Sequence, residues 1–217
     1  MILEPIVPTV LSVRRLPNAD PAMIRAYGGD PERHRSLGLV TVDQDDPTYV
    51  ALDEATKHAP VDVIFAKSFY AGAAHASGRL SGEILGVLGA TEPEAIEHAL
   101  DALLRCLKHD ACFYDADGKG TVTVFPHVIA SLGEYLSKEA GLAAGEPMAY
   151  LVAPPLEASI ALDAALKAAE VRALKVMTPP TETNFAAAWL TGTLDECEAA
   201  AVAYAAAVVD VAAAPKR

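Results

Sequence analysis

The sequence Ala-Leu-Asp-Glu-Ala-Thr-Lys occupies residues 51–57, and a close copy, Ala-Leu-Asp-Ala-Ala-Leu-Lys, occupies residues 161–167. Both copies lead into a short segment that begins with valine, at residues 61–65 and 171–175. Such self-similarity at a fixed separation is typical of a duplicated structural unit. The sequence therefore predicts a protein made of two related halves.

Each copy of the repeat has the pattern of an amphipathic helix. Asp53 and Lys57, like Asp163 and Lys167, lie four positions apart, in the order that favours an i,i+4 ion pair on an exposed face. The opposite face, which we expect to be buried, carries Leu52, Ala55 and Ala59 in the first copy and Leu162, Ala165 and Ala169 in the second. Two interpretations of the charged pairs remain open: they are ordinary solvated pairs, or their lysines reach a neighbouring molecule.

The rest of the first half alternates strands and helices. Asp20 followed by Pro21 predicts the start of a short helix with Asp20 as its N-cap, and Thr91 with Glu94 predicts a capping box on a later helix. The expected elements are a strand at 8–13, the helix after Asp20, a strand at 36–42, an acidic turn at 43–47 leading into the repeat helix, a strand at 61–66, a loop at 68–82, a strand at 83–88 and a helix ending near residue 107.

The second half is expected to repeat this plan. Its expected elements are a strand at 111–114, a helix at 126–138, a strand at 148–152, the second repeat helix at 155–169, a strand at 171–176, a polar loop at 178–184, a strand at 189–193 and a helix at 194–211. The fold class is therefore α+β, with helices packed against a mixed sheet. We expect two domains, at residues 1–109 and 110–217.

Composition limits the possible partners. The 217 residues carry a net charge of −12, which argues against nucleic acid and anionic membranes as partners. A hydrophobic fraction of 52% is high for a soluble monomer, so part of the apolar surface is expected in subunit contacts. The three cysteines form no CxxC pair, which suits a reducing cytosol, and neither a signal peptide nor a membrane-spanning run is expected.

The repeat resembles the signature of the bacterial microcompartment shell domain. Further motifs are similar to those of the L-type tandem shell proteins of ethanolamine-utilisation compartments, in which the ferredoxin-like shell domain is circularly permuted. These motifs are HRSLGL at 34–39, DDPTY at 45–49, YAGAAH at 70–75, MAYLVAPPLEA at 148–158 and PPTETN at 179–184. The resemblance implies a homotrimer shaped like a hexamer, which tiles a shell in the bacterial cytoplasm together with other shell proteins. It also implies that Lys57 and Lys167 contact neighbouring tiles.

The same resemblance implies a gated central pore through which small molecules pass. Its walls would come from the two long loops, in which glycine and alanine permit several backbone states. The alternative for the two aromatic residues is ordinary anchoring in the fold. The expected pore residues are Phe69, Tyr70, Ala71, Gly72, Ala73, Thr183 and Asn184.

The family also has small pores within each subunit, where ethanolamine can bind. An ammonium group favours carboxylate acceptors and a π surface, so acidic residues near the loops are the candidates. For Asp45 and Asp46 the alternative is a purely structural role at a helix N-terminus. The residues that the resemblance assigns to this ligand site are Asp45, Asp46, Glu83, Phe113, Thr181 and Glu182.

Two other classes of function are alternatives to a shell protein. An enzyme is disfavoured, because the six histidines fall in no HExxH or paired metal-ligand spacing and the chain has no GxSxG, P-loop or GxGxxG motif. We therefore expect no catalytic residue, no metal and no cofactor. A discrete trimeric sensor or binding protein with the same fold stays open; it would share the acidic site but would not assemble into sheets.

Overall fold

The computed structural model describes residues 3–69, 79–179 and 185–216. The chain forms two compact units, and each is described by itself. Unit 1 comprises Met1–Ile6, Cys112–Leu132 and Ala140–Arg217, and unit 2 comprises Val7–Ala111 and Gly133–Glu139. The expected domain boundary between residues 109 and 110 stays a prediction.

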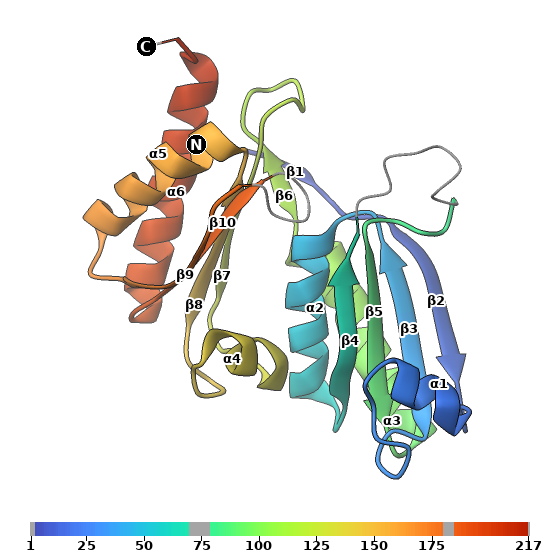
Figure 1. The fold of residues 1–217 in the computed structure, drawn as a ribbon. Helices are drawn as coiled ribbons and strands as arrows, with labels where there is room; N and C mark the ends of the chain where they lie inside the picture. Colours follow the sequence, from blue (N-terminus) through green and yellow to red (C-terminus); the bar gives the residue numbers. More distant parts are fainter. Residues whose placement is uncertain (1–2, 70–78, 180–184, 217) are drawn as a thin grey trace. The chain divides into compact units, whose positions relative to one another are not determined.

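Unit 2 is built on an antiparallel sheet with the strand order β2-β3-β5-β4 (Figure 1). Its strands are β2 (Val10–Leu16), β3 (Ser36–Val42), β4 (Asp62–Ser68) and β5 (Ile84–Ala90), and its helices are α1 (Pro21–Ala26), α2 (Asp45–His58), α3 (Pro93–His109) and most of α4 (Glu134–Ala140).

Glycines let two helices pack closely on one face of this sheet. A Cβ atom at Gly38 would lie 2.9 Å from Ile96 of α3, and one at Gly86 would lie 3.0 Å from Leu52 of α2. The opposite face carries α1, whose Ile24 is buried in one cluster with Leu37. Side chains of β3 therefore alternate between the α2/α3 face and the α1 face, as the pleat requires.

The starts of α1 and α3 were both expected to carry a side-chain cap, and only α1 does. The N-cap of α1 is confirmed, since Asp20 accepts the backbone N–H of Ala22 at 2.8 Å. The capping box at the start of α3 is wrong: the N-cap is Glu92, which makes no side-chain capping bond. Thr91 instead donates its hydroxyl to the carbonyl of Arg33 at 2.9 Å, because the chain before α3 lies beside the loop that leads into β3.

Unit 1 holds a sheet with the order β1-β6-β7-β8-β10-β9, antiparallel throughout. Its elements are β1 (Glu4–Ile6), β6 (Phe113–Asp115), β7 (Thr123–Ile129), β8 (Met148–Ala153), α5 (Pro155–Ala168), β9 (Arg172–Met177), β10 (Ala186–Thr191) and α6 (Leu194–Ala213).

The core of unit 1 is rich in alanine. Ala161 and Ala165 of α5 and Ala200 of α6 are fully buried, and Tyr204 of α6 fills the space that these small side chains leave. Small residues at a helix contact allow the two backbones to approach closely, which explains why a nearly featureless apolar run folds as the long helix α6. None of the helices in the described part of the chain is both long and apolar enough to cross a membrane.

The two sheets confirm the α+β class and show one plan twice. The order β7-β8-β10-β9 in unit 1 repeats β2-β3-β5-β4 in unit 2, and α5 and α6 follow β8 and β10 as α2 and α3 follow β3 and β5. The expected mixed sheet is wrong: in both sheets every pair of neighbouring strands is antiparallel.

The expected helix at 126–138 is wrong. Its first part is the strand β7, and the helix α4 begins only at Glu134. A proline inside a strand removes one ladder donor, so proline is tolerated where one side of the strand is unpaired. Pro126 meets this condition: β7 pairs with β6 only through Thr123 and Val124, while Pro126 pairs with Leu151 of β8 on the other side.

Candidate functional site

A group of carboxylates gathers in unit 2 where β3 ends and α2 begins. Asp45 and Asp46 form the first turn of α2 and are 7% and 8% exposed. Asp43, just before the helix, accepts the backbone N–H of Thr9 at 2.6 Å. Glu83 is brought beside them because its N–H donates to the carbonyl of Val42 at 2.8 Å. The acidic cluster is thus Asp43, Asp45, Asp46 and Glu83.

The pKa of Glu83 shows that these carboxylates act on one another. Burial raises this pKa first, and the negative charges of Asp45 and Asp43 raise it further. Like charges held together favour a proton or another cation between them. An ammonium ion placed here would relieve the repulsion, so the cluster suits a small cationic ligand.

Gly82 fixes the approach of Glu83 to the end of β3. Its φ angle is +64°, and a Cβ atom there would lie 2.1 Å from the carbonyl oxygen of Val42. No other residue can occupy this position without moving the chain, because the backbone itself is in the way. The acidic cluster therefore depends on a glycine that the sequence pattern did not single out.

The other residues assigned to the ligand site belong to unit 1 or lie outside the described residues. Phe113 lies in unit 1, on β6, with its ring centroid 5.1 Å from that of Phe125. Thr181 and Glu182 lie outside the described residues. The structure thus brings Asp45, Asp46 and Glu83 together.

Of the expected pore residues, one is described. Phe69 directly follows β4, is 36% exposed and donates its N–H to the carbonyl of Glu83 at 2.9 Å, next to the acidic cluster. The others lie outside the described residues: Tyr70, Ala71, Gly72, Ala73, Thr183 and Asn184.

Both ends of the segment 69–79 are tied to the sheet by side chains. Tyr49 of α2 and Ser68 share a hydroxyl hydrogen bond of 2.6 Å, and the N–H of Ser68 donates to the Tyr49 oxygen at 3.0 Å. On the return side, Thr41 donates its hydroxyl to the carbonyl of Leu80 at 2.7 Å. Tyr49 and Thr41 are therefore positioning residues that sequence reasoning missed, since hydroxyls on a helix and a strand carry no special pattern.

The two copies of the repeat helix use their aspartates differently. Asp163 is exposed and pairs with Lys167 at 2.6 Å, as expected. The expected Asp53–Lys57 pair is wrong, because Asp53 is fully buried and accepts the backbone N–H of Leu136 at 2.8 Å. Lys57 instead pairs with a neighbour one turn back, Glu54, and keeps a side chain that is 26% exposed.

The sequence of this chain is similar to those of bacterial proteins of known class. No family model matches the chain. The bacterial microcompartment shell protein EutL of Clostridium perfringens is 49% identical over 208 residues, which cover 96% of this chain and 95% of the relative. This chain belongs to the EutL family of bacterial microcompartment shell proteins.

Solved structures agree with this assignment. The ethanolamine utilization protein EutL from Leptotrichia buccalis has a TM-score of 0.94 at 46% identity, with all of both chains covered. The trimeric shell protein PduB shares the fold, with a TM-score of 0.74 at 16% identity over 94% of this chain and 89% of that one. The expected family and fold are confirmed, and as a member of the EutL family the chain is a structural shell protein and not an enzyme.

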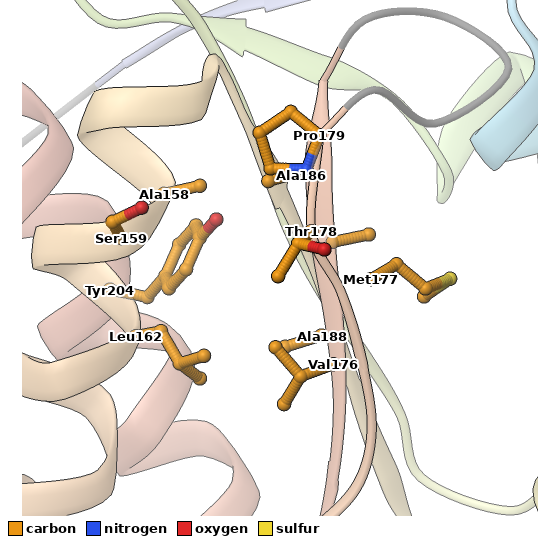
Figure 2. Close-up of a pocket in the computed structure, with 11 residues that line it drawn as sticks. Ala158, Ser159, Leu162, Val176, Met177, Thr178, Pro179, Ala186, Ala188 and Tyr204 are labelled. Atoms are coloured by element: carbon orange, nitrogen blue, oxygen red, sulfur yellow. The ribbon is translucent and has the colours of Figure 1, made fainter.

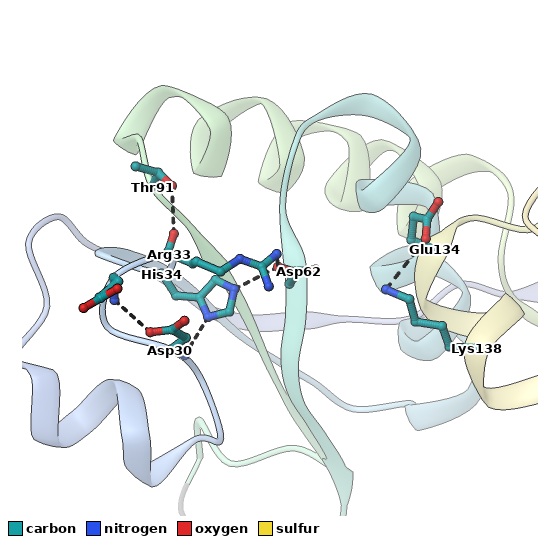
Figure 3. A network of polar contacts seen from close by, with 8 residues as sticks. Asp30, Arg33, His34, Asp62, Thr91, Glu134 and Lys138 are labelled. Carbon is teal, nitrogen blue, oxygen red and sulfur yellow. Dashed lines mark hydrogen bonds and ion pairs between the residues drawn. The ribbon is translucent and has the colours of Figure 1, made fainter.

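A buried histidine organises the loop before β3 of this EutL-family chain (Figure 3). The N–H of Asp30 donates to Nδ1 of His34 at 2.9 Å, so the ring proton lies on Nε2, which donates to Asp62 of β4 at 2.8 Å. Arg33 adds a second donor to the same carboxylate at 3.0 Å. The network joins the loop to β4, and a Cβ atom at Gly89 would lie 2.9 Å from the imidazole. This hydrogen-bond network therefore has a structural role.

An apolar cavity of about 50 Å³ opens between the helices and the sheet of unit 1. Leu162 and Tyr204 approach it from α5 and α6, and Val176 and Thr178 face them from the side of β9 (Figure 2). Nearby, Ile160 of α5 is 51% exposed and Val176 is 50% exposed. Exposed apolar side chains that lie together mark candidate contact surfaces for another molecule.

No group of histidine, cysteine, aspartate and glutamate able to hold a metal ion occurs among the described residues. All three cysteines are free thiols, with Cys106 and Cys197 buried and Cys112 partly exposed. Burial raises the pKa of Cys106 to about 12, which keeps the thiol protonated and unreactive.

Proposed function

We propose that the chain forms a homotrimer in which six related domains make a ring, and that this ring is one tile of a microcompartment shell. The observation that carries the proposal is the repeated strand order in the two units, since a duplicated unit lets three chains imitate six-fold packing. The domains would be residues 1–109 and 110–217. The exposed apolar side chains beside the cavity of unit 1 support subunit contacts at that face.

We propose that the tile admits small polar metabolites. The segments that contain Phe69, Tyr70, Ala71, Gly72 and Ala73, and Thr183 and Asn184, would surround a central opening. The hydroxyl bonds of Tyr49 and Thr41 support this, because they hold Ser68 and Leu80, which lie at the two ends of the first segment, against the rest of unit 2.

The metabolite that we propose is ethanolamine, or a closely related amine. The acidic cluster supports this choice, because burial and then the neighbouring carboxylates raise the pKa of Glu83, and a bound ammonium group would offset the repulsion between these carboxylates. Phe113, Thr181 and Glu182 would complete the site with a π surface and polar acceptors. The compartment would then be one that uses ethanolamine.

The contacts between tiles would use Lys57 and Lys167. Both sit in the last turn of a repeat helix, where a long side chain can reach outward to a neighbour's carbonyl groups. Lys167 supports this best, since its side chain is 73% exposed even while it contacts Asp163. The neighbours would be further copies of this chain and other shell proteins.

Negative-stain electron microscopy tests the assembly. The wild type should form extended hexagonal sheets or tubes, and a Lys57→Ala/Lys167→Ala variant should remain trimeric in light scattering but lose the sheets. A Lys138→Ala variant is the matched control, because Lys138 is an exposed lysine whose contact with Glu134, at 3.7 Å, lies within one helix (Figure 3). Isolated wild-type particles would instead favour a discrete binding protein, and unchanged sheets in the double variant would refute the lysine contacts.

A further inference from the structure

The twin helices α3 and α6 begin differently. The start of α6 is satisfied by the chain itself: Thr193 donates its N–H to Glu196 at 2.6 Å and accepts the N–H of Glu196 at 3.4 Å. At the start of α3, no side chain of the described residues makes a capping bond. Pro93 has no N–H, so the groups left without a helical acceptor are those of Glu94 and Ala95.

A buried hydroxyl lies beside this uncapped start. Ser36 begins β3 and is 2% exposed, yet its Oγ has no hydrogen-bond partner among the described residues. The side chain shares the face of Gly38, where an added Cβ would touch Ile96 in the first turns of α3. Burying a hydroxyl without a hydrogen-bond partner costs free energy. A ligand that accepts a hydrogen bond from Ser36 would remove this cost.

Ser36 opens into a cavity of about 290 Å³ between β2, β3 and the start of α3. Pro93, Ile96 and Glu97 line the helix side, and Arg15 of β2 lines the opposite side. Arg15 is held over the cavity by an ion pair with Glu97, in which both side chains are more than half exposed. Its guanidinium has further N–H groups to offer, because one carboxylate oxygen uses only part of its donor set.

We propose that this cavity binds a phosphate group. Two backbone N–H groups, the Ser36 hydroxyl and the Arg15 guanidinium supply donors from the helix and the sheet, an arrangement that suits a tetrahedral oxyanion. The helix dipole adds to the attraction. The twin position in unit 1 cannot bind in this way, since Glu196 already occupies the start of α6.

The surrounding acidic residues keep this binding weak. Glu92, Glu94 and Glu97 all lie in or beside the first turn of α3, and their charges oppose an anion. Removing the carboxylate that holds Arg15 should therefore strengthen binding. Such a site would be occupied at high phosphate concentration and empty at low concentration.

Calorimetric titration of the intact protein at fixed ionic strength tests the proposal. Inorganic phosphate should bind saturably, Ser36→Ala should weaken the affinity by roughly tenfold, and Glu97→Gln should strengthen it. Titration with glycerol phosphate separates the two sources of the group: tighter binding of the ester indicates a phosphorylated metabolite, and weaker binding indicates free phosphate. Acetate binding more tightly than both would overturn the assignment to phosphate.

A Glu92→Thr variant is the sharpest control. It gives α3 the N-cap residue of α6 and should raise Tm, so any loss of binding cannot come from misfolding. It also removes a negative charge, which by itself would tighten phosphate binding. Weaker binding in this variant supports competition for the helix N–H groups. Tighter binding, or an isotherm unchanged in Ser36→Ala, would overturn the proposed site.

Discussion

The carboxylate of Asp53 accepts the backbone N–H of Gly133 at 2.7 Å. The same carboxylate accepts the N–H of Leu136, and Thr56 accepts the N–H of Glu134 at 3.0 Å. One turn of α2 therefore caps the start of α4, a helix that follows it by many residues in the chain. These contacts explain why residues 133–139 belong to unit 2, although the strand before them belongs to unit 1.

Replacing Asp53 should harm folding more than replacing its twin. Asp53→Asn leaves one buried backbone N–H facing an amide NH₂ group, so we expect a loss of about 2 kcal/mol in the free energy of unfolding. Asp163→Asn breaks only an exposed pair with Lys167 and should change that free energy by less than about 0.5 kcal/mol. Urea unfolding of both variants measures the difference.

Equal effects of the two substitutions would contradict the capping role of Asp53. A second check uses hydrogen exchange, because the amides of Gly133 and Leu136 are the direct partners. In Asp53→Asn these amides should exchange faster, while the amides in the middle of α5 should not change.

The identity of the repeat was predictable from the sequence, but the roles of its residues were not. The boundaries of α2 and α5 follow from apolar periodicity, which is a local property. The fate of Asp53 depends on Gly133, which lies 80 residues away, and no local pattern carries that information. The repeated motif therefore predicted the fold correctly, but it predicted an exposed position for Asp53, which is buried.

The same limit explains the misplaced elements in the second half. Proline is common at the first position of a helix, so Pro126 fits the expected helix, whereas the β-branched residues on both sides of it form the strand β7. The sheet accepts this proline only because β6 is short, which again is a tertiary fact. The acidic cluster was more predictable, since Asp45 and Asp46 stand at a helix start and Glu83 directly precedes a strand.

Ethanolamine binding should release protons through Glu83. The folded protein raises the pKa of Glu83 above its ordinary value of 4.5, so part of this group stays protonated in the pH range just above that value. A bound ammonium favours the ionised carboxylate and expels the proton. Calorimetry in two buffers of different ionisation enthalpy should show this release at pH values just above 4.5, and Glu83→Gln should abolish it.

The matched control is Glu146→Gln, which removes an exposed carboxylate far along the chain from the acidic cluster. It should retain both the affinity and the proton release. Wild-type binding with no proton release at any pH would show that Glu83 does not face the ligand, whereas absence of binding would count against the site as a whole.

The raised pKa of Glu83 also predicts a pH dependence of stability. Because the folded state holds this proton more tightly than the unfolded state does, the contribution of Glu83 is fully present below pH 4.5 and is lost as the pH rises through the folded pKa. The Tm of Glu83→Gln minus the Tm of wild type should therefore increase as the pH rises from about 4 to 7. A constant difference across that range would contradict the raised pKa.

The two long helices α3 and α6 differ in how their first turns are capped. Thr193 is the N-cap of α6 and makes reciprocal bonds with Glu196, so Thr193→Ala should cost about 1 kcal/mol of unfolding free energy. Thr91 stands before α3 but does not cap it, and Thr91→Ala removes only an exposed bond to the carbonyl of Arg33, worth about 0.5 kcal/mol. Thermal unfolding of both variants measures the contrast. If Thr91→Ala cost as much as Thr193→Ala, the start of α3 would have to be capped in solution, and the helix N–H groups would not be open to a ligand.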